Sequence, residues 1–480
     1  MAQSGATGVR KGEGDFGFDA KYGITSGLTW DFTYNTDFSQ VEADEQQVNL
    51  TRFNLFFPEK REFFLENSGI FRFGGGDVNG GNFNPIGGRT AGVSNEVFFF
   101  SRNIGLSGDN EAVPILGGTR LTGRAGSYEI GFLNMQQREY KNTHATNFTI
   151  ARLKHNIMAN SDIGVMMMDK EVKDSLQFNR VIGADANFRF GQGTTFTTSL
   201  AKGSTPGVKS DNLDGRFAFG YQNRTFNYAA AYTNIQENFI NEMGYIPRRG
   251  VQRFGSNIRW AIRTRSTFIR QIGPHFILDY FADTHGNFDS KYIDYHLPIS
   301  FQSGAQMEIG KNPTVEVVRK AFTFNNGKNV VLAGTYSYHD YFVFFRGDSS
   351  RRLQPQVRWG IGPFYTGYKH SYSIGETWRL NNKFNSSLTY TYNNISLADG
   401  HFKTNLVTTR VNYSFSTTVF LNALVQYNSD ARQWSSNIRF NIIHRPLSDF
   451  FFVYNERRNT LTGDLLDRAL IAKITYMIQR

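Results

Sequence analysis

Cysteine is absent from this 480-residue sequence, and no long hydrophobic run interrupts it. Without cysteine, a disulfide framework and a cysteine-ligated zinc site are both excluded. A transmembrane helix needs about 18 or more consecutive apolar residues, so the lack of such a run excludes a helical membrane span. Residues 1–5 show no basic stretch followed by an apolar one, so no signal peptide is visible, and we expect a cleaved, recombinant or truncated start.

A concentrated patch of charge is missing as well. The net charge is +11, but the basic residues are spread along the whole chain without a basic run. No signature of a nucleic-acid-binding fold accompanies them, so we expect no nucleic-acid partner. Diffuse positive charge instead suits solvated loops and a polar interior.

What the chain does contain is alternation. From about residue 115 to the C-terminus, apolar and polar residues follow one another with a period of two, which is typical of strands with one apolar and one polar face. Clear examples are residues 216–222, 256–263, 386–393 and 436–443. Residues 381–382 predict a short turn, whereas residues 204–214, 234–249 and 283–291 predict longer loops. The last strand is predicted over residues 470–479.

Two architectures produce such alternation: a soluble sandwich and a membrane barrel. The segments often run about 9 to 12 residues, the length of a tilted membrane strand, whereas soluble strands average about 5 or 6. The polar faces carry Gly, Ser, Thr, Asn and Arg, and aromatic residues, 15% of the chain, end the apolar faces. A mean hydropathy of −0.42 fits a barrel, because only alternate residues face lipid.

We therefore predict an all-β fold, a single transmembrane antiparallel β-barrel in the outer membrane of a Gram-negative bacterium. The predicted strand number is roughly 22, between about 18 and 26. Aromatic side chains expected to face lipid or its interface are Trp260, Tyr390, Tyr392, Phe440 and Tyr476. Cationic side chains expected to face the lumen are Arg216, Arg259, Arg263, Arg439 and Lys473. An arginine-lined pore attracts anions, unless these arginines pair with carboxylates and conduct nothing.

Residues 39–114 break the alternation. An acidic stretch precedes Pro58, which suits the first turn of a short helix, and a glycine-rich run follows at residues 74–82. Irregular backbone cannot face lipid, because its polar groups would be unpaired. We predict one barrel domain over residues 1–480 in which residues 39–114 form an inward-folded constriction or partial plug. The alternative is a long external loop.

Charged residues of this segment are candidates for a plug or gate: Glu59, Lys60, Arg61, Glu62, Glu66 and Asp77. They either form salt bridges with arginines of the barrel wall or satisfy one another within two helical turns. Inward packing would also bury the phenylalanines of the segment: Phe56, Phe57, Phe63, Phe64 and Phe71.

The run Leu55-Phe56-Phe57-Pro58-Glu59-Lys60-Arg61-Glu62-Phe63-Phe64-Leu65-Glu66-Asn67 resembles the signature of a family of outer-membrane proteins with a C-terminal barrel of unassigned function. Weaker matches follow at residues 99–106, 115–123, 131–136 and 423–428. Members of this family usually carry an N-terminal domain similar to the family-nine carbohydrate-binding modules. Because the barrel pattern begins by Phe16, we expect that domain to be absent here, so the resemblance implies neither sugar binding nor a catalytic residue.

Motifs for catalysis or metal binding are not found. The nine histidines form no His-Glu-x-x-His pattern, and no Gly-x-Ser-x-Gly motif occurs. Asp77, Asn79 and Asn82 superficially resemble a calcium loop, but Gly81 stands where a ligand is needed and no glutamate closes the loop. We therefore predict no catalytic residue, no metal and no cofactor.

The leading hypothesis is a passive or gated channel for small polar or anionic solutes. The alternatives are a non-conducting membrane anchor for a periplasmic carbohydrate-binding-like module and, with less support, an outer-membrane hydrolase. A TonB-dependent transporter is disfavoured, because no separate plug domain precedes the barrel pattern. The expected partners are outer-membrane lipid, the barrel assembly machinery and a small polar or anionic solute.

Overall fold

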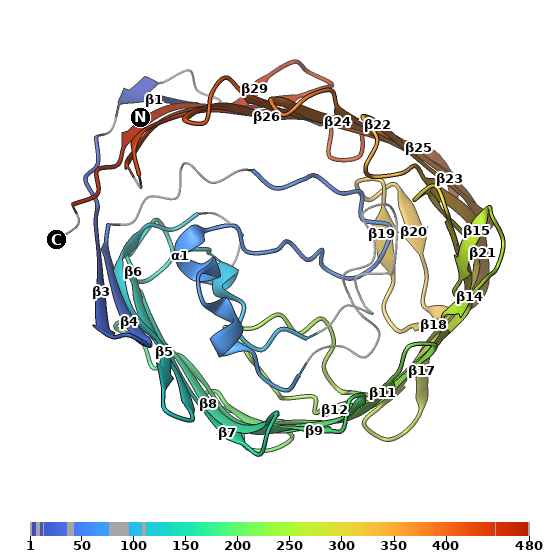
Figure 1. Cartoon of the computed structure of the whole chain (residues 1–480), viewed down its shortest axis with the longest axis horizontal. Coiled ribbons are helices and arrows are strands. Elements are labelled where there is room, and N and C mark those ends of the chain that lie inside the picture. The colour runs from blue at the N-terminus through green and yellow to red at the C-terminus, as the bar shows by residue number, and fades with distance from the viewer. Residues whose placement is uncertain are drawn as a thin grey trace.

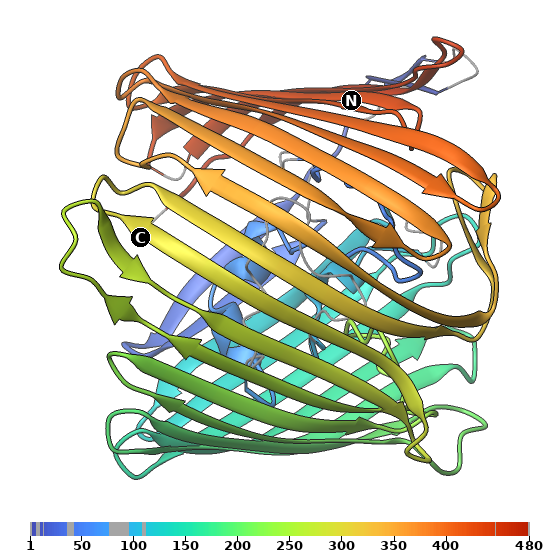
Figure 2. The same ribbon diagram turned by 90° about the vertical axis from the view of Figure 1, so that its right-hand side faces the viewer.

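The computed structural model of the protein describes residues 2–5, 10–12, 14–35, 43–75, 96–107, 112–446 and 448–478. Its strands form one antiparallel 27-stranded sheet and a separate hairpin of β19 (Phe322–Phe324) and β20 (Asn329–Val331). Figure 1 shows the large sheet curved into a ring, and Figure 2 shows the long strands tilted across its wall. Among the described helices, none has the length and apolar character to cross a membrane.

The long strands follow one another along the chain, and each pairs antiparallel with its neighbours. In the first half they are β3 (Phe18–Thr25), β4 (Leu28–Tyr34), β5 (Ile115–Ala125), β6 (Tyr128–Gln137), β7 (Thr146–Ile157), β8 (Ser161–Val172), β9 (Phe178–Phe190), β10 (Thr194–Ser204), β11 (Leu213–Gln222), β12 (Phe226–Ile235) and β13 (Val251–Trp260). In the second half they are β16 (His275–Asp283), β17 (Phe288–Phe301), β18 (Gln306–Val318), β21 (Gly334–Arg346), β22 (Leu353–Phe364), β23 (Gly367–Arg379), β24 (Phe384–Leu397), β25 (Gly400–Ser414), β26 (Val419–Asn428), β27 (Gln433–Arg445), β28 (Ser448–Asn459) and β29 (Leu465–Ile474).

The predicted strand number is wrong, because 27 strands exceed the upper bound of about 26. Four members of the sheet have only two to four residues: β1 (Ala2–Gly5), β2 (Arg10–Gly12), β14 (Ile262–Arg263) and β15 (Ile269–Ile272). Strands this short carry too little alternation to be recognised in a sequence. At the seam, β29 pairs with β1 and β1 with β2, and among the described residues no pairing joins either end to β3.

Two predicted boundaries are also wrong, for local reasons. The loop predicted over residues 283–291 is a tight turn from Asp283 to Phe288, because the Asp283 Oδ1 accepts the backbone N–H groups of His285 and Asn287. The last strand ends at Ile474 rather than near residue 479, where its pairing with Phe450 of β28 ends. Elsewhere, residues 216–222, 386–393 and 436–443 lie inside β11, β24 and β27.

Alternation appears directly in the exposure of the long strands. On β23, Ile374 is 57% exposed, whereas the neighbouring Ser373 is 3% exposed. Trp260, Tyr390 and Tyr476 are exposed, Tyr392 and Phe440 are half-buried, and Tyr476 lies beyond the last strand.

Replacing the exposed Ile374 by arginine tests which medium contacts the outer face. Ile374 lies near the middle of β23. At the centre of a bilayer, arginine on a lipid-facing strand destabilises a barrel by about 2–4 kcal/mol. We expect that loss for Ile374→Arg in urea unfolding from lipid vesicles, and almost none for the control Ile374→Leu. Equal unfolding free energies for the two variants would place the outer face in water.

Candidate functional site in the interior of the ring

Residues 43–75 and 96–107, here named the inner segment, connect β4 to β5. Figure 1 shows its helix α1 (Glu62–Leu65) within the ring rather than outside it. Two short 3-10 helices belong to the same segment: η1 (Ser68–Phe71) and η3 (Ser101–Asn103). Pro58 precedes α1 by four residues, so the helix begins later than the sequence predicts.

The inner segment contacts walls that are far apart in the sheet. Near its start, the backbone N–H of Gln46 donates to the Gln426 side chain on β26 (2.7 Å). The side-chain amide of Gln46 donates to the Ser435 hydroxyl on β27 (2.8 Å). Arg52 then donates to Glu316 on β18 (2.7 Å). Further along, the segment packs on β5 to β10. It therefore crosses the interior instead of following one wall.

Apolar side chains hold the second half of the segment on the wall. Phe64, Phe71, Phe73 and Ile104 share one buried cluster with inward side chains of the strands, which include Leu133, Met135, Phe148, Ile150 and Met168. Wall glycines make room for them: a Cβ on Gly131 would lie 2.6 Å from Ile70 Cγ2, and one on Gly183 would lie 2.5 Å from Phe73 Cζ. Full burial of such a side chain contributes about 1.5–3 kcal/mol.

Arg120 on β5 joins the wall to α1. Its side chain is 2% exposed and binds the carboxylate of Asp31 on β4, with Nη2 at 2.8 Å. The same guanidinium donates to the Glu66 carboxylate (2.9 Å), to the Glu66 carbonyl (2.8 Å) and to the Phe63 carbonyl. Removing one partner of a buried ion pair typically costs about 3–5 kcal/mol, which applies to Arg120 and Asp31 within the wall. The attachment to α1 depends on the two carbonyls together with the Glu66 carboxylate, which is 42% exposed.

Arg152 and Asp185 form a second buried pair at the wall, between β7 and β9. Their bidentate contacts measure 2.6 and 2.9 Å, and both side chains are almost inaccessible. Asp185 also accepts the backbone N–H of Gly74 (3.2 Å), and the Arg152 guanidinium lies 5.6 Å from the centre of the Phe73 ring. One buried charge pair therefore contacts the inner segment through both a backbone and an aromatic group.

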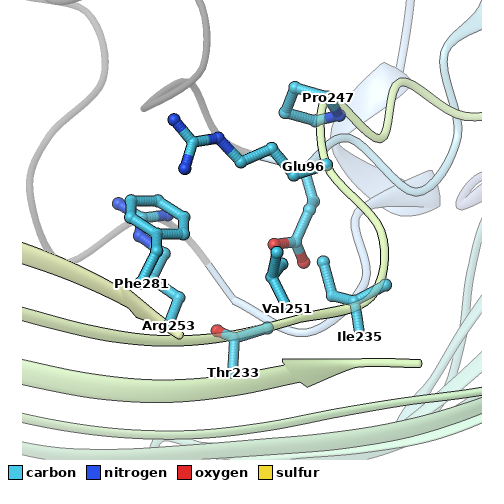
Figure 3. Close-up of a pocket in the computed structure, with 8 residues that line it drawn as sticks. Glu96, Thr233, Ile235, Pro247, Val251, Arg253 and Phe281 are labelled. Atoms are coloured by element: carbon cyan, nitrogen blue, oxygen red, sulfur yellow. The ribbon is translucent and has the colours of Figure 1, made fainter. Parts of the chain in front are cut away.

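A third contact between the inner segment and the wall is centred on Arg248, in the connection between β12 and β13. Arg248 donates to Ser290 and to the Tyr292 hydroxyl, both at 2.7 Å, and stacks 4.4 Å from the ring centre of Phe53. A small cavity of about 10 Å³ lies beside it, enough for roughly one water molecule. Figure 3 shows Glu96 of the inner segment entering this cavity opposite Arg253 and Phe281 of the wall.

Glu59 forms hydrogen bonds with other residues of the inner segment. Its carboxylate accepts from the Arg61 guanidinium (2.6 and 2.8 Å), from the Arg61 backbone N–H (2.9 Å) and from the Ser101 hydroxyl (2.7 Å). Burial acts to raise the pKa of the Glu59 carboxyl, but these hydrogen bonds and the charge of Arg61 outweigh it and lower that pKa. Arg61 in turn donates to the carbonyls of Ser101 and Ile104, so this cluster joins α1 to η3.

The remaining gate candidates have separate surroundings. Lys60 donates to the Ala43 carbonyl (2.8 Å) and lies 3.8 Å from the Asp44 carboxylate, so its contacts stay inside the segment. Glu66 binds Arg120 and also Lys21 on β3. Glu62 is exposed. Asp77 lies outside the described residues, as does the glycine-rich run from residue 76.

Strand register and alternation place four of the predicted pore residues on the inner face. Arg216 is opposite Ser199, whose hydroxyl would lie 2.8 Å from a Cβ on Gly74 of the inner segment. Arg259 follows the inward Val251 by eight residues on β13, and Arg439 follows Ser435 by four on β27. Lys473 follows Ile471, which shares a cross-strand row with Arg439.

Arg263 is the exception among these candidates. It lies in β14, beyond a break at Ala261, and is exposed, so the alternation of β13 does not determine its direction. Sequence reasoning did not single out Arg120, Arg152, Arg248 or Arg253. Arg120 shares a face of β5 with Gly118 and Thr122, and that alternation was the signal available for it. Arg152 shares its face of β7 with Phe148 and Ile150, so alternation gave no signal there.

Comparisons with known proteins give one family and several distant folds. A model of the family described as "Domain of unknown function (DUF5916)" matches residues 2–442. No curated protein matches the chain. Matching structures include the outer membrane protein opdK from Pseudomonas aeruginosa, with 11% identity, a TM-score of 0.38, and coverage of 67% of this chain and 96% of that one.

Two further matches are receptors. BauA, the ferric preacinetobactin receptor from Acinetobacter baumannii, has 8% identity and a TM-score of 0.39, with 76% of this chain and 70% of that one covered. Fiu, the ferric-catecholate import receptor from E. coli K12, has 6% identity and a TM-score of 0.40, with 75% and 72% covered. TM-scores this low transfer no function to this chain.

The lowered pKa of Glu59 predicts a pH-dependent inner segment. A lowered pKa contributes stability that is fully present above the usual glutamate value of 4.5 and is lost as pH falls through the lowered pKa. We expect Glu59→Gln to reduce hydrogen-exchange protection of residues 61–66 several-fold at pH 7, and the difference from the parent to vanish on acidification. The exposed Glu62→Gln is the matched control. Equal protection in the parent and Glu59→Gln at pH 7 would contradict the assigned role.

Proposed function

The chain belongs to the DUF5916 family, whose description assigns no activity, and we propose that it is an outer-membrane β-barrel that acts as a passive or gated channel for small polar or anionic solutes. In this proposal the sheet closes into a barrel over residues 1–480. Residues 39–114 form the constriction or partial plug of its lumen.

The inversion of polarity across the wall carries the proposal. Ile182, Leu200, Phe217 and Ile374 are each more than half exposed on the outer face. The inner face instead buries charged side chains, such as those listed here: Arg120, Arg152, Asp185, Asp279 and Glu316. Soluble proteins rarely expose apolar surface on this scale, whereas a barrel in lipid needs an outward apolar band and a polar interior. The outer partner is then lipid, and insertion requires the barrel assembly machinery.

The charge of the interior supports an anionic or polar solute. Arg216, Arg259 and Arg439 lie on the inner face, and the whole chain carries a net charge of +11. Cationic side chains along a pore attract anions and repel cations. Solutes would therefore meet a positive interior on either side of the inner segment.

A non-conducting anchor is the second candidate, and one observation favours it. The inner segment contacts β18, β26 and β27 at one end and β5 to β10 at the other, so it fills a path across the interior. If this arrangement never opens, the barrel serves only to hold a periplasmic module at the membrane. Conductance separates the two functions.

Deletion of residues 70–95 tests the channel directly. The deletion removes Ile70, Phe71 and Phe73, which fix the segment to the wall, so we expect single-channel conductance in planar bilayers to rise several-fold. Deletion of residues 206–209, in the connection between β10 and β11, is the control that leaves the inner segment intact. No conductance from either folded variant would establish the anchor and overturn the channel.

A further inference from the structure

Three metal-binding side chains meet on adjacent strands, away from the contacts of the inner segment described above. His275 begins β16, His296 lies on β17 and Glu308 lies on β18. The sheet register pairs His275 with His296, and it places Glu308 two residues from the partner of His296, Gly310. Because His275, Asp279 and Phe281 alternate on one face of β16, and Phe281 belongs to the cluster with the inner segment, this trio faces the interior.

The donor atoms of the trio converge on one point. His275 Nε2 lies 3.0 Å from His296 Nδ1, and His296 Nδ1 lies 2.8 Å from Glu308 Oε1. All three donor atoms fall within 4.8 Å of one another. His296 and Glu308 keep 14% and 13% of their side chains accessible, so neither is sealed from solvent.

Neighbouring groups decide which nitrogen of His296 is available. The Asn312 amide nitrogen donates to Asp340 (3.1 Å), which turns its Oδ1 toward His296 Nε2 (2.7 Å). Since that oxygen only accepts, Nε2 carries the proton of a neutral His296 and Nδ1 presents a lone pair. The lone pair then faces the Glu308 carboxylate, which also offers only lone pairs. A cation between the two removes the repulsion.

The donor set favours a metal ion as that cation. Two imidazole nitrogens and one carboxylate match a three-ligand zinc site with water as the fourth ligand. Zinc bonds of about 2.0–2.1 Å in a tetrahedron separate the ligand atoms by roughly 3.3 Å. The two contacts of His296, at 3.0 and 2.8 Å, therefore need to lengthen by a few tenths of an ångström, and the third pair already lies within 4.8 Å. A second ligand layer is present too, because metal-binding histidines usually donate their other N–H, as His296 does to Asn312.

The surroundings provide room and balanced charge for the trio. Gly310 lies opposite His296, and a Cβ there would overlap the rings of His296 and Phe342. The charged groups facing the trio are two cations and two anions, listed here: Arg259, Arg358, Asp294 and Asp340. Their charges offset one another, so the charge of Glu308 is left for the ion.

We propose that His275, His296 and Glu308 form an interior binding site for a divalent transition-metal ion such as Zn²⁺, positioned by Asn312. The site goes beyond the proposed channel function and does not depend on it. No short sequence motif predicts this site. His275 and His296 are 21 residues apart, and His296 and Glu308 are 12 apart, and these spacings are set by strand and turn lengths.

Co²⁺ titration of the full chain in detergent tests the site, because tetrahedral Co²⁺ gives a visible absorption band, and calorimetry with Zn²⁺ measures affinity. We expect one saturable site in the parent protein, loss of the band in His296→Asn and Glu308→Gln, and Zn²⁺ affinity weaker by about 10- to 100-fold in Asn312→Ala. His401→Gln, which alters an exposed histidine on β25, should bind as the parent does.

Far-UV circular dichroism identifies the variants that remain folded, and Glu308→Gln serves where His296→Asn does not fold. Saturable binding lost in the folded Glu308→Gln variant supports the site. Absence of saturable binding in the parent, or equal binding in the parent and Glu308→Gln, would overturn the proposed metal site. In that case a protonated histidine, and not a metal ion, would balance the charge of Glu308.

Discussion

Arginine side chains on the inner face of the ring need partners, and the inner segment provides some of them. Arg120 is almost wholly buried and binds Asp31 of the wall together with groups of α1. Arg152 is neutralised by Asp185, which in turn accepts a backbone N–H of the segment. Charges buried without such partners would cost several kcal/mol each. The position of the segment therefore depends on its hydrogen bonds to these paired wall charges, with the phenylalanine cluster adding apolar contact area.

The strands were accessible to sequence reasoning because alternation is a local property. Residues 216–222, 386–393 and 436–443 each show one apolar and one polar face within seven or eight residues, and each lies in a strand. Strand number was not accessible, because β14 and β15 are too short to alternate and pair only through the sheet. The turn after Asp283 was misjudged because its closure depends on side-chain acceptors rather than on composition.

The sequence predicted a charged segment in the interior, but it did not predict which residues form ion pairs there. The irregular composition of residues 39–114 indicated a segment that avoids lipid, and its glutamates indicated cationic partners. Which partner each one takes depends on the tertiary fold: Glu66 meets Arg120 across 54 positions, whereas Glu59 pairs with Arg61 in its own segment. The trio of His275, His296 and Glu308 exists only through the register of three strands, so no motif search finds it.

A cross-linking measurement tests most directly whether the inner segment lies against this wall. A Cβ on Gly131 of β6 would lie 2.6 Å from Ile70 Cγ2, so cysteines at both positions are within disulfide reach, and the chain has no other cysteine. We predict that the double variant Ile70→Cys/Gly131→Cys cross-links in lipid vesicles. The control Ile70→Cys/Gly375→Cys should not, since Figure 1 places β23 across the ring from β6. No cross-link in the first variant, or equal cross-linking in both, would contradict it.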